Sequence, residues 1–389
     1  METRKASSHR YQFISQTLRD RLRDGIWVPG VRLPTLRRLA HQFDVSTNTV
    51  RNAIRVLEQE GSLYRVHGVG TFVRPVCPTR SDSGLKQQKE ATLALVMADL
   101  GDAMETSVAR GVEQACRGRA WRMQVYDSRH DARLEIENLS GLPQSGACGA
   151  IIFPTCCAAT IEPLFRLKLG GFPFVLVDRS IRGLQVDVVE SDHEQGAYLA
   201  TLHLIEQGHR RILMLTDPPV LSSVEARIRG YERALLDNGL TPQAEWKIWP
   251  TSPVTEDDLE KGQRWIRAYE AAVPGLRRIE PPVAMFAYNA HGGWGAVEAC
   301  RAVGLRIPED VSVVCFDDTE ITRALSPPIT TIAQQPVQIG RKAVELLERR
   351  LQFADAEPQH VCLEVSLIKR QSVLTVGRGL ATATLAGSP

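Results

Sequence analysis

The sequence predicts an α/β fold class, in which an N-terminal winged helix-turn-helix precedes a larger two-lobed, doubly wound parallel α/β domain. Three observations lead to this prediction. Basic residues are concentrated in the first 80 of the 389 residues. Three short helical periodicities and a hairpin pattern follow one another in that part. From Thr92 onward, apolar β-type runs alternate with helical stretches in two consecutive sets.

Charge is distributed unevenly between these two parts. The chain carries a net charge of +2, but residues 1–80 hold 14 Lys and Arg against 6 Asp and Glu. The remainder holds 33 against 39 and is therefore acidic. Thirteen of the fourteen basic residues in the first part are Arg, whose guanidinium suits phosphates and guanine edges. A small basic domain joined to a larger acidic one favours nucleic acid as the partner of the first.

Composition excludes several other classes of protein. With 43% hydrophobic and 24% charged residues, the chain is of the ordinary globular kind. No apolar run approaches the roughly 18–20 residues of a membrane span, and the basic start has no apolar segment behind it, so no secretory signal is expected. The eight cysteines form no C-x-x-C pair and the nine histidines no H-E-x-x-H motif. We therefore expect a cytoplasmic protein with no metal, no cofactor and no membrane contact.

The first domain is expected to contain three helices and a hairpin. Apolar residues at helical spacing predict the helices within residues 10–24, 36–43 and 47–57, and Ser46 is placed to cap the third. Two β-type runs, 63–66 and 71–74, are separated by a glycine-containing turn and predict the hairpin. A tight turn between the second and third helices completes the pattern of a winged helix-turn-helix.

The third helix leaves a polar face for solvent at its N-terminal end. This face presents Thr47, Asn48, Thr49 and Arg51, which can donate to phosphates and read base edges. A solvated face on a packing helix would look the same. The excess of Arg and the hairpin favour the DNA-binding interpretation.

The segment LPTLRRLAHQFDVSTNTVRNAIRVLEQEGSLYRVHGVGTFV resembles the DNA-binding module of the GntR family of bacterial regulators, over about residues 9–74. The resemblance implies that Arg37, Asn48, Thr49 and Arg51 contact DNA. It also implies that His67 and Gly68 form the tip of a wing in the minor groove. Many members carry Arg where Thr47 stands, which implies a different operator base at that position.

The remaining chain divides into a linker, a large domain and a tail. We predict domain boundaries at residues 1–74 for the head, 75–91 for the linker, 92–374 for a two-lobed effector-binding domain and 375–389 for a flexible tail. Strands are expected near residues 93–98, 123–126, 149–153, 174–177, 212–215, 246–249, 283–287 and 311–316. Helices are expected near 104–118, 131–139, 159–169, 194–207, 224–238, 256–272 and 292–303. With crossovers near 186–191 and 329–334, these elements predict two similar lobes and a ligand cleft at the carboxyl ends of the strands.

This part resembles the effector domain of the LacI/GalR family, which is similar to periplasmic sugar-binding proteins. The segments that carry the resemblance are FPFVLVDRS, HLIEQGHRRILML, ARIRGYERALLDNGL, PPVAMFAYN, GLRIPEDVSVVCFDD and SPPITTIAQQP. The resemblance implies a small-molecule site between the lobes, with Arg227 as its anchor. Further effector-binding candidates are Asp178, Ser223, Trp249, Asn289 and Gln334. A hinge contact for Asp178 and a half-buried core position for Trp249 are close alternatives.

Two departures from the family pattern are visible. Ala290 stands where members usually have an Asp that binds ligand hydroxyls, and Asp102-Ala103-Met104-Glu105 replaces the usual Asn-Pro-Phe-Phe. The site is therefore expected to take an unusual ligand, to use His291 or Glu105 instead, or to bind weakly. The pair Asp317-Asp318 matches a structural turn of the family.

Together these features predict a ligand-responsive transcription regulator, in the first instance a repressor, that binds operator DNA as a homodimer and a sugar or similar small molecule between its lobes. An α/β enzyme is one alternative, although the sequence shows no converging nucleophile, acid–base pair or phosphate loop. A sugar-binding transport protein is the other, and the basic head argues against it.

Overall fold

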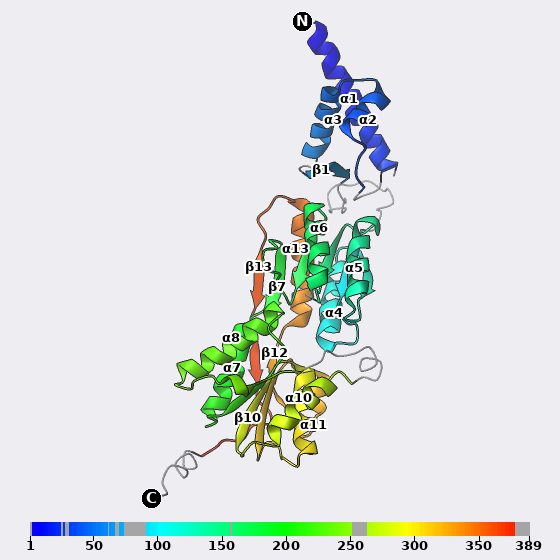
Figure 1. Ribbon diagram of the computed structural model, residues 1–389. Coiled ribbons are helices and arrows are strands. Elements are labelled where there is room, and N and C mark those ends of the chain that lie inside the picture. The colour runs from blue at the N-terminus through cyan, green and yellow to red at the C-terminus, as the bar shows by residue number, and fades with distance from the viewer. Residues whose placement is uncertain are drawn as a thin grey trace, which may run out of the picture.

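The computed structural model describes residues 2–24, 26–27, 31–60, 62–66, 70–73, 91–155, 158–250 and 263–377 (Figure 1). The predicted wing-tip residues His67 and Gly68 lie outside the described residues, as do nearly all of the predicted linker and tail. None of the described helices has the length and apolar character needed to cross a membrane.

The head is a winged helix-turn-helix, as predicted. Its elements are α1 (Glu2–Arg23), α2 (Leu36–Phe43), α3 (Thr47–Gln59), β1 (Leu63–Val66) and β2 (Gly70–Val73). The strands β1 and β2 pair antiparallel. Ile14 and Leu18 of α1, Leu39 of α2, and Val50 and Leu57 of α3 are almost completely buried in one apolar core. The first helix begins at Glu2 rather than near residue 10.

The first lobe is built on a wholly parallel sheet. Its strands are β3 (Thr92–Met97), β4 (Arg122–Asp127), β5 (Gly149–Ile152), β6 (Phe174–Val177), β7 (Asp187–Ser191) and β13 (His360–Leu363), in the order β13-β7-β6-β5-β3-β4. Its helices are α4 (Ala103–Arg117), α5 (Ala132–Gly141), α6 (Ala158–Leu169) and α13 (Pro336–Gln352). Alternate residues of β3 face opposite sides: Leu93 and Leu95 pack with α4 and α13, whereas Ala94 and Val96 pack with α5 and α6.

The second lobe repeats this arrangement with one exception. Its strands are β8 (Ile212–Leu215), β9 (Lys247–Ile248), β10 (Val283–Ala287), β11 (Val311–Phe316), β12 (Thr330–Ala333) and β14 (Ser366–Ile368), in the order β14-β12-β11-β10-β8-β9. Its helices are α7 (His193–Glu206), α8 (Ser222–Asp237), α10 (Ile266–Leu276), α11 (Ala290–Ala302) and α12 (Glu320–Ala324). The edge strand β14, which was not predicted, runs antiparallel to β12, whereas the other strands of this sheet run parallel as predicted.

The described part of the chain crosses between the lobes three times. Two crossings, from β7 to α7 and from β12 to α13, were predicted, although each predicted crossover segment is itself largely a strand. The third, from β13 to β14, was not predicted. Neither was α13, which returns the chain to the first lobe and packs against α4. Figure 1 shows the two lobes and the segments between them.

The crossing of α4 and α13 gives a test of this packing. A Cβ atom at Gly340 would lie 2.2 Å from the carbonyl oxygen of Val108 and 2.7 Å from the amide nitrogen of Val112, both backbone atoms of α4. We therefore expect Gly340→Ala to destabilise the protein by about 1–3 kcal/mol, the usual cost of overpacking. Thermal unfolding followed by circular dichroism measures this change. The matched control is Gly141→Ala, because nothing lies within 4 Å of a Cβ there, and equal stability of both variants would contradict the packing.

Candidate functional site

The N-terminal end of α3 is exposed and polar, as the sequence predicted. The side chain of Ser46 caps the helix by accepting from the Thr49 amide at 3.1 Å, and its Oγ lies 2.8 Å from Thr49 Oγ1. Thr47, Asn48 and Arg51 are exposed, and Arg51 Nη1 donates to Asn48 Oδ1 at 3.1 Å. These groups form one hydrogen-bonding surface at the start of the helix.

The arginines of the head divide into two kinds. Arg19 pairs with Glu60 at 2.7 Å and so ties α1 to the end of α3. The guanidinium of Arg21 lies over the ring of Phe43, 5.0 Å from its centroid. Arg37 is exposed in the first turn of α2. The charge of the head therefore serves partly to hold its helices together, and Arg37 and Arg51 are the predicted contacts that remain available to a ligand.

A cavity of about 590 Å³ lies between the two lobes. Polar residues that follow the C-terminal ends of six strands line this cavity. They are Asp99 after β3, Asp178 after β6, Asp217 after β8, Tyr288 and Asn289 after β10, Asp317 after β11 and Gln334 after β12. The carboxyl ends of both sheets thus face the cavity, which is where open parallel sheets place their ligands.

The structure brings five of the six predicted effector-binding residues together. Asp178, Ser223, Arg227, Asn289 and Gln334 all line the cavity. Trp249 does not, because its side chain is 43% exposed and only its neighbour Pro250 reaches the lining. The stacking of Trp249 on a ligand ring therefore stays a prediction. His291 and Glu105, considered as substitutes for the missing Asp, both line the cavity.

Arg227 is the most unusual of these groups. Its side chain is 5% exposed, and its guanidinium lies over the ring of Phe316 at 3.9 Å from the centroid. It donates to the carbonyl oxygen of Tyr288 and lies 3.2 Å from His193 Nδ1. No carboxylate of the described chain forms an ion pair with it, and its Nε has no partner there. A buried positive charge without a carboxylate partner favours a ligand that supplies hydrogen-bond acceptors.

Asp178 and Asp317 occupy equivalent positions in the two lobes. Each follows a buried strand and has a positive φ, of 65° and 74° respectively. Asp178 Oδ2 lies 3.2 Å from Arg179 Nε, and Asp317 accepts from Gln334 Nε2. Left-handed backbone at non-glycine residues is uncommon and concentrates at binding sites. Asp317 thus occupies a turn directly after β11, as the family resemblance implied, and it also lines the cavity.

Burial shifts the pKa of several cavity groups in the direction that favours their uncharged forms. Burial raises the pKa of Glu105 well above its ordinary value, and the nearby charge of Asp102 adds to this; its Oε2 accepts from the amides of Ala98 and Asp99 at 2.9 and 3.0 Å. Burial also raises the pKa of Asp217, although a hydrogen bond with Tyr288 opposes the shift. Burial lowers the pKa of His130 below its usual range.

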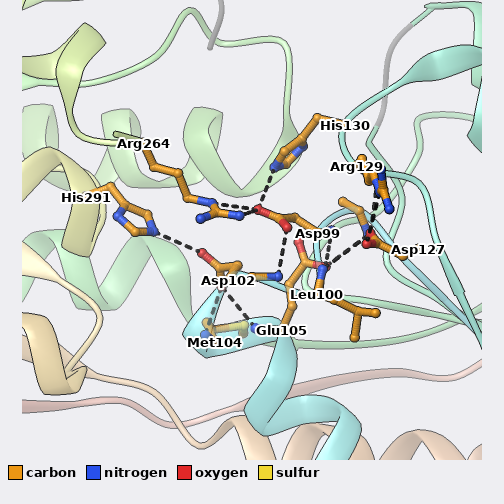
Figure 2. A network of polar contacts seen from close by, with 12 residues as sticks. Asp99, Leu100, Asp102, Met104, Glu105, Asp127, Arg129, His130, Arg264 and His291 are labelled. Atoms are coloured by element: carbon orange, nitrogen blue, oxygen red, sulfur yellow. Dashed lines mark hydrogen bonds and ion pairs between the residues drawn. The ribbon is translucent and has the colours of Figure 1, made fainter. Parts of the chain in front are cut away.

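An ionic network joins the lobes beside the cavity (Figure 2). Arg264, just before α10, places Nη2 2.7 Å from Asp99 Oδ2 of the first lobe. His291 Nε2 of α11 lies 3.7 Å from Asp102 Oδ2. Burial raises the pKa of Asp102, but the hydrogen bond and charge of His291 outweigh this, so the pKa lies below its usual value.

Sequence reasoning missed Asp99, Asp217, Arg264, Tyr288 and the cavity role of Asp317. Four of these five directly follow a strand, so the rule that ligands bind at the carboxyl ends of strands would have found them. Arg264 had no such signal, because its partner Asp99 is 165 residues away in the sequence.

Comparisons with known proteins agree with this geometry. The family model described as "Bacterial regulatory proteins, gntR family" matches residues 10–73, and the one described as "Periplasmic binding protein-like domain" matches residues 201–373. The arabinose metabolism transcriptional repressor of Geobacillus stearothermophilus is 30% identical over 87% of this chain and 90% of its own. The chain belongs to this family of transcriptional repressors.

Solved structures share the fold of the repressor. A LacI family regulator from Enterococcus faecium with bound ribose matches with a TM-score of 0.61 and 25% identity, over 74% of this chain and all of that chain. The Lac repressor dimer bound to operator matches with a TM-score of 0.62 and 22% identity, over 74% of this chain and 96% of that chain. The curated relatives are repressors rather than enzymes, so the alternative of an α/β enzyme falls away.

The cavity carboxyl of Asp317 gives the repressor a pH-dependent stability. Burial raises its pKa from 3.8 to about 6, and the charge of Arg227 opposes the shift. Because the folded pKa lies above the unfolded one, the repressor gains stability as the pH falls through about 6. A shift of this size corresponds to at most about 3 kcal/mol, and partial exposure of the side chain reduces it to about 1–2 kcal/mol.

We therefore expect Asp317→Asn to be more stable than the wild type at pH 7.5 and equally stable near pH 4. Asn suits the left-handed backbone and can still bond Gln334, so the substitution changes mainly the charge. Thermal unfolding at several pH values measures the difference. A difference that stays constant from pH 4 to 8 would contradict the raised pKa.

Proposed function

We propose that this repressor binds operator DNA as a homodimer through the exposed start of α3, and that a neutral sugar bound between the lobes changes its operator affinity. The observation that carries the sugar site is Arg227, a buried guanidinium in the cavity with an unsatisfied Nε and no carboxylate partner in the described chain. Because it acts on DNA, we expect the protein in the cytoplasm.

The chemistry of the cavity fits a small polyol. Arg227 offers donors, Asp317 and Asp178 offer acceptors, and Asn289 offers an amide from the start of α11. Sugar hydroxyls both donate and accept, so they can satisfy such a mixed set. The volume of about 590 Å³ lies within the usual range of small-molecule sites. The names of relatives, an arabinose metabolism repressor and a ribose operon repressor, favour a pentose.

A dimer follows from the size of the head. One helix in the major groove contacts too few base pairs for high specificity. Two heads bound to two half-sites contact about twice as many. A ligand that prefers one arrangement of the lobes would change the spacing of these heads and hence the affinity for the operator. The head and the cavity are thus separable by mutation.

The first prediction concerns the head. Arg51→Ala should weaken specific operator binding by about 1–3 kcal/mol if Arg51 reads a base, without loss of fold. Fluorescence anisotropy with an operator selected from random DNA by the full chain measures the change, and affinity should fall steeply with salt. The control is Arg117→Ala, because that arginine is exposed in the first lobe. Equal affinities of Arg51→Ala and the wild type would contradict the assignment.

The second prediction concerns the cavity. Arg227→Ala should leave operator affinity in the absence of sugar intact and abolish its response to the sugar found by a thermal-shift screen of pentoses and hexoses. Removal of the anchor removes the ligand's preference for one lobe arrangement. The control is Arg229→Ala, since Arg229 lies two residues further along α8, is exposed and pairs with Glu194. A normal sugar response in Arg227→Ala would refute the proposed site.

A further inference from the structure

Two contacts between acidic and basic side chains join the lobes across the cleft. Arg264 of the second lobe places both Nε and Nη2 2.7 Å from Asp99 Oδ2 of the first. His291 Nε2 lies 3.7 Å from Asp102 Oδ2. Figure 2 shows Arg264 and His291 reaching toward the loop between β3 and α4. The acidic partners are all on one lobe and the basic partners on the other.

The Asp99 side of this contact is fixed by its own loop. Asp99 Oδ1 accepts from the Gly101 amide at 2.8 Å, which leaves Oδ2 for Arg264. His130 Nε2 lies 3.8 Å from the same oxygen. The side chains of Asp99 and Arg264 are 6% and 19% exposed, so solvent and salt screen their attraction far less than that of a surface pair.

Gly101 makes room for the arginine. A Cβ atom at this position would lie 2.2 Å from Arg264 Nη2 and 2.9 Å from its Cζ. Such contacts are too short for any real side chain. An alanine there would displace the flexible end of Arg264 and would leave every charge in place.

We propose that the Asp99–Arg264 pair, assisted by Asp102 and His291, is an electrostatic latch that holds the two lobes closed before an effector binds. The latch raises the fraction of molecules in which both walls of the cavity are assembled. Each tenfold loss of that closed fraction weakens the apparent affinity for a ligand of the closed form about tenfold. The latch therefore sets the sensitivity of the repressor through the closed fraction, although its four residues also line the cavity.

The test uses the full chain without any sugar. Hydrogen–deuterium exchange is measured by mass spectrometry for peptides covering residues 153–155 and 288–292, which line the cleft from opposite lobes. We expect Asp99→Asn, Arg264→Gln and the double variant to exchange faster than the wild type and to the same extent as one another, because each one breaks the same pair. Gly101→Ala should exchange like these variants although it keeps both charges. Glu194→Gln, which breaks ion pairs within the second lobe, should not differ from the wild type.

Other outcomes overturn the latch. If the increases in exchange rate of the two single variants add up in the double variant, Asp99 and Arg264 act separately. Wild-type exchange in Gly101→Ala or in Arg264→Gln would show that the pair does not hold the lobes. Wild-type exchange together with weakened sugar binding in Arg264→Gln would identify Arg264 as a ligand contact instead. Because no sugar is present in the exchange measurement, the latch can fail while the proposed function stands, and the reverse also holds.

Discussion

The carboxyl ends of two parallel sheets face each other across one cavity, and the other properties of the repressor depend on this constraint. Six strand ends deliver polar side chains to the lining, so Asp99, Asp178, Asp217 and Asp317 lie in one small volume although they are far apart in sequence. Burial raises the pKa of Asp217 and of Asp317. The same burial leaves the charge of Arg227 without a carboxylate partner among the described residues. Buried polar groups of this kind gain partners either from a polar ligand or from a contact between the lobes.

Much of this architecture was predictable from local pattern. Uniformly apolar runs such as β10 and β11 are typical of buried parallel strands, and Ser46 before the polar start of α3 signalled a capped helix. The helix α13 and the strands β13 and β14 were not predicted. The two strands are short and half exposed, and their partners β7 and β12 lie far away in the sequence, so their own residues carry little periodic signal.

The site residues that were predicted are mainly those that the family resemblance reached, although the strand-end rule would also have found Asp99, Asp217 and Tyr288. Arg227, Asn289 and Gln334 stand in the predicted place, and they line the cavity together. Trp249 illustrates the limit of such transfer, because the residue is present but is not among those that line the cavity. The pair of Asp99 and Arg264 illustrates the opposite limit. This pair depends on the distance between the two lobes and on the absence of a side chain at Gly101. No local sequence motif predicts either property.

Coupling between the cavity and the head is the central claim, and thermodynamic reciprocity tests it most directly. If the sugar changes operator affinity by some factor, the operator must change sugar affinity by the same factor. Isothermal titration calorimetry with the full chain, performed with and without saturating operator, measures the second factor, and anisotropy titrations measure the first. The account predicts that both factors differ from one and agree with each other. A sugar that binds the cavity with the same affinity whether or not operator is present would contradict it.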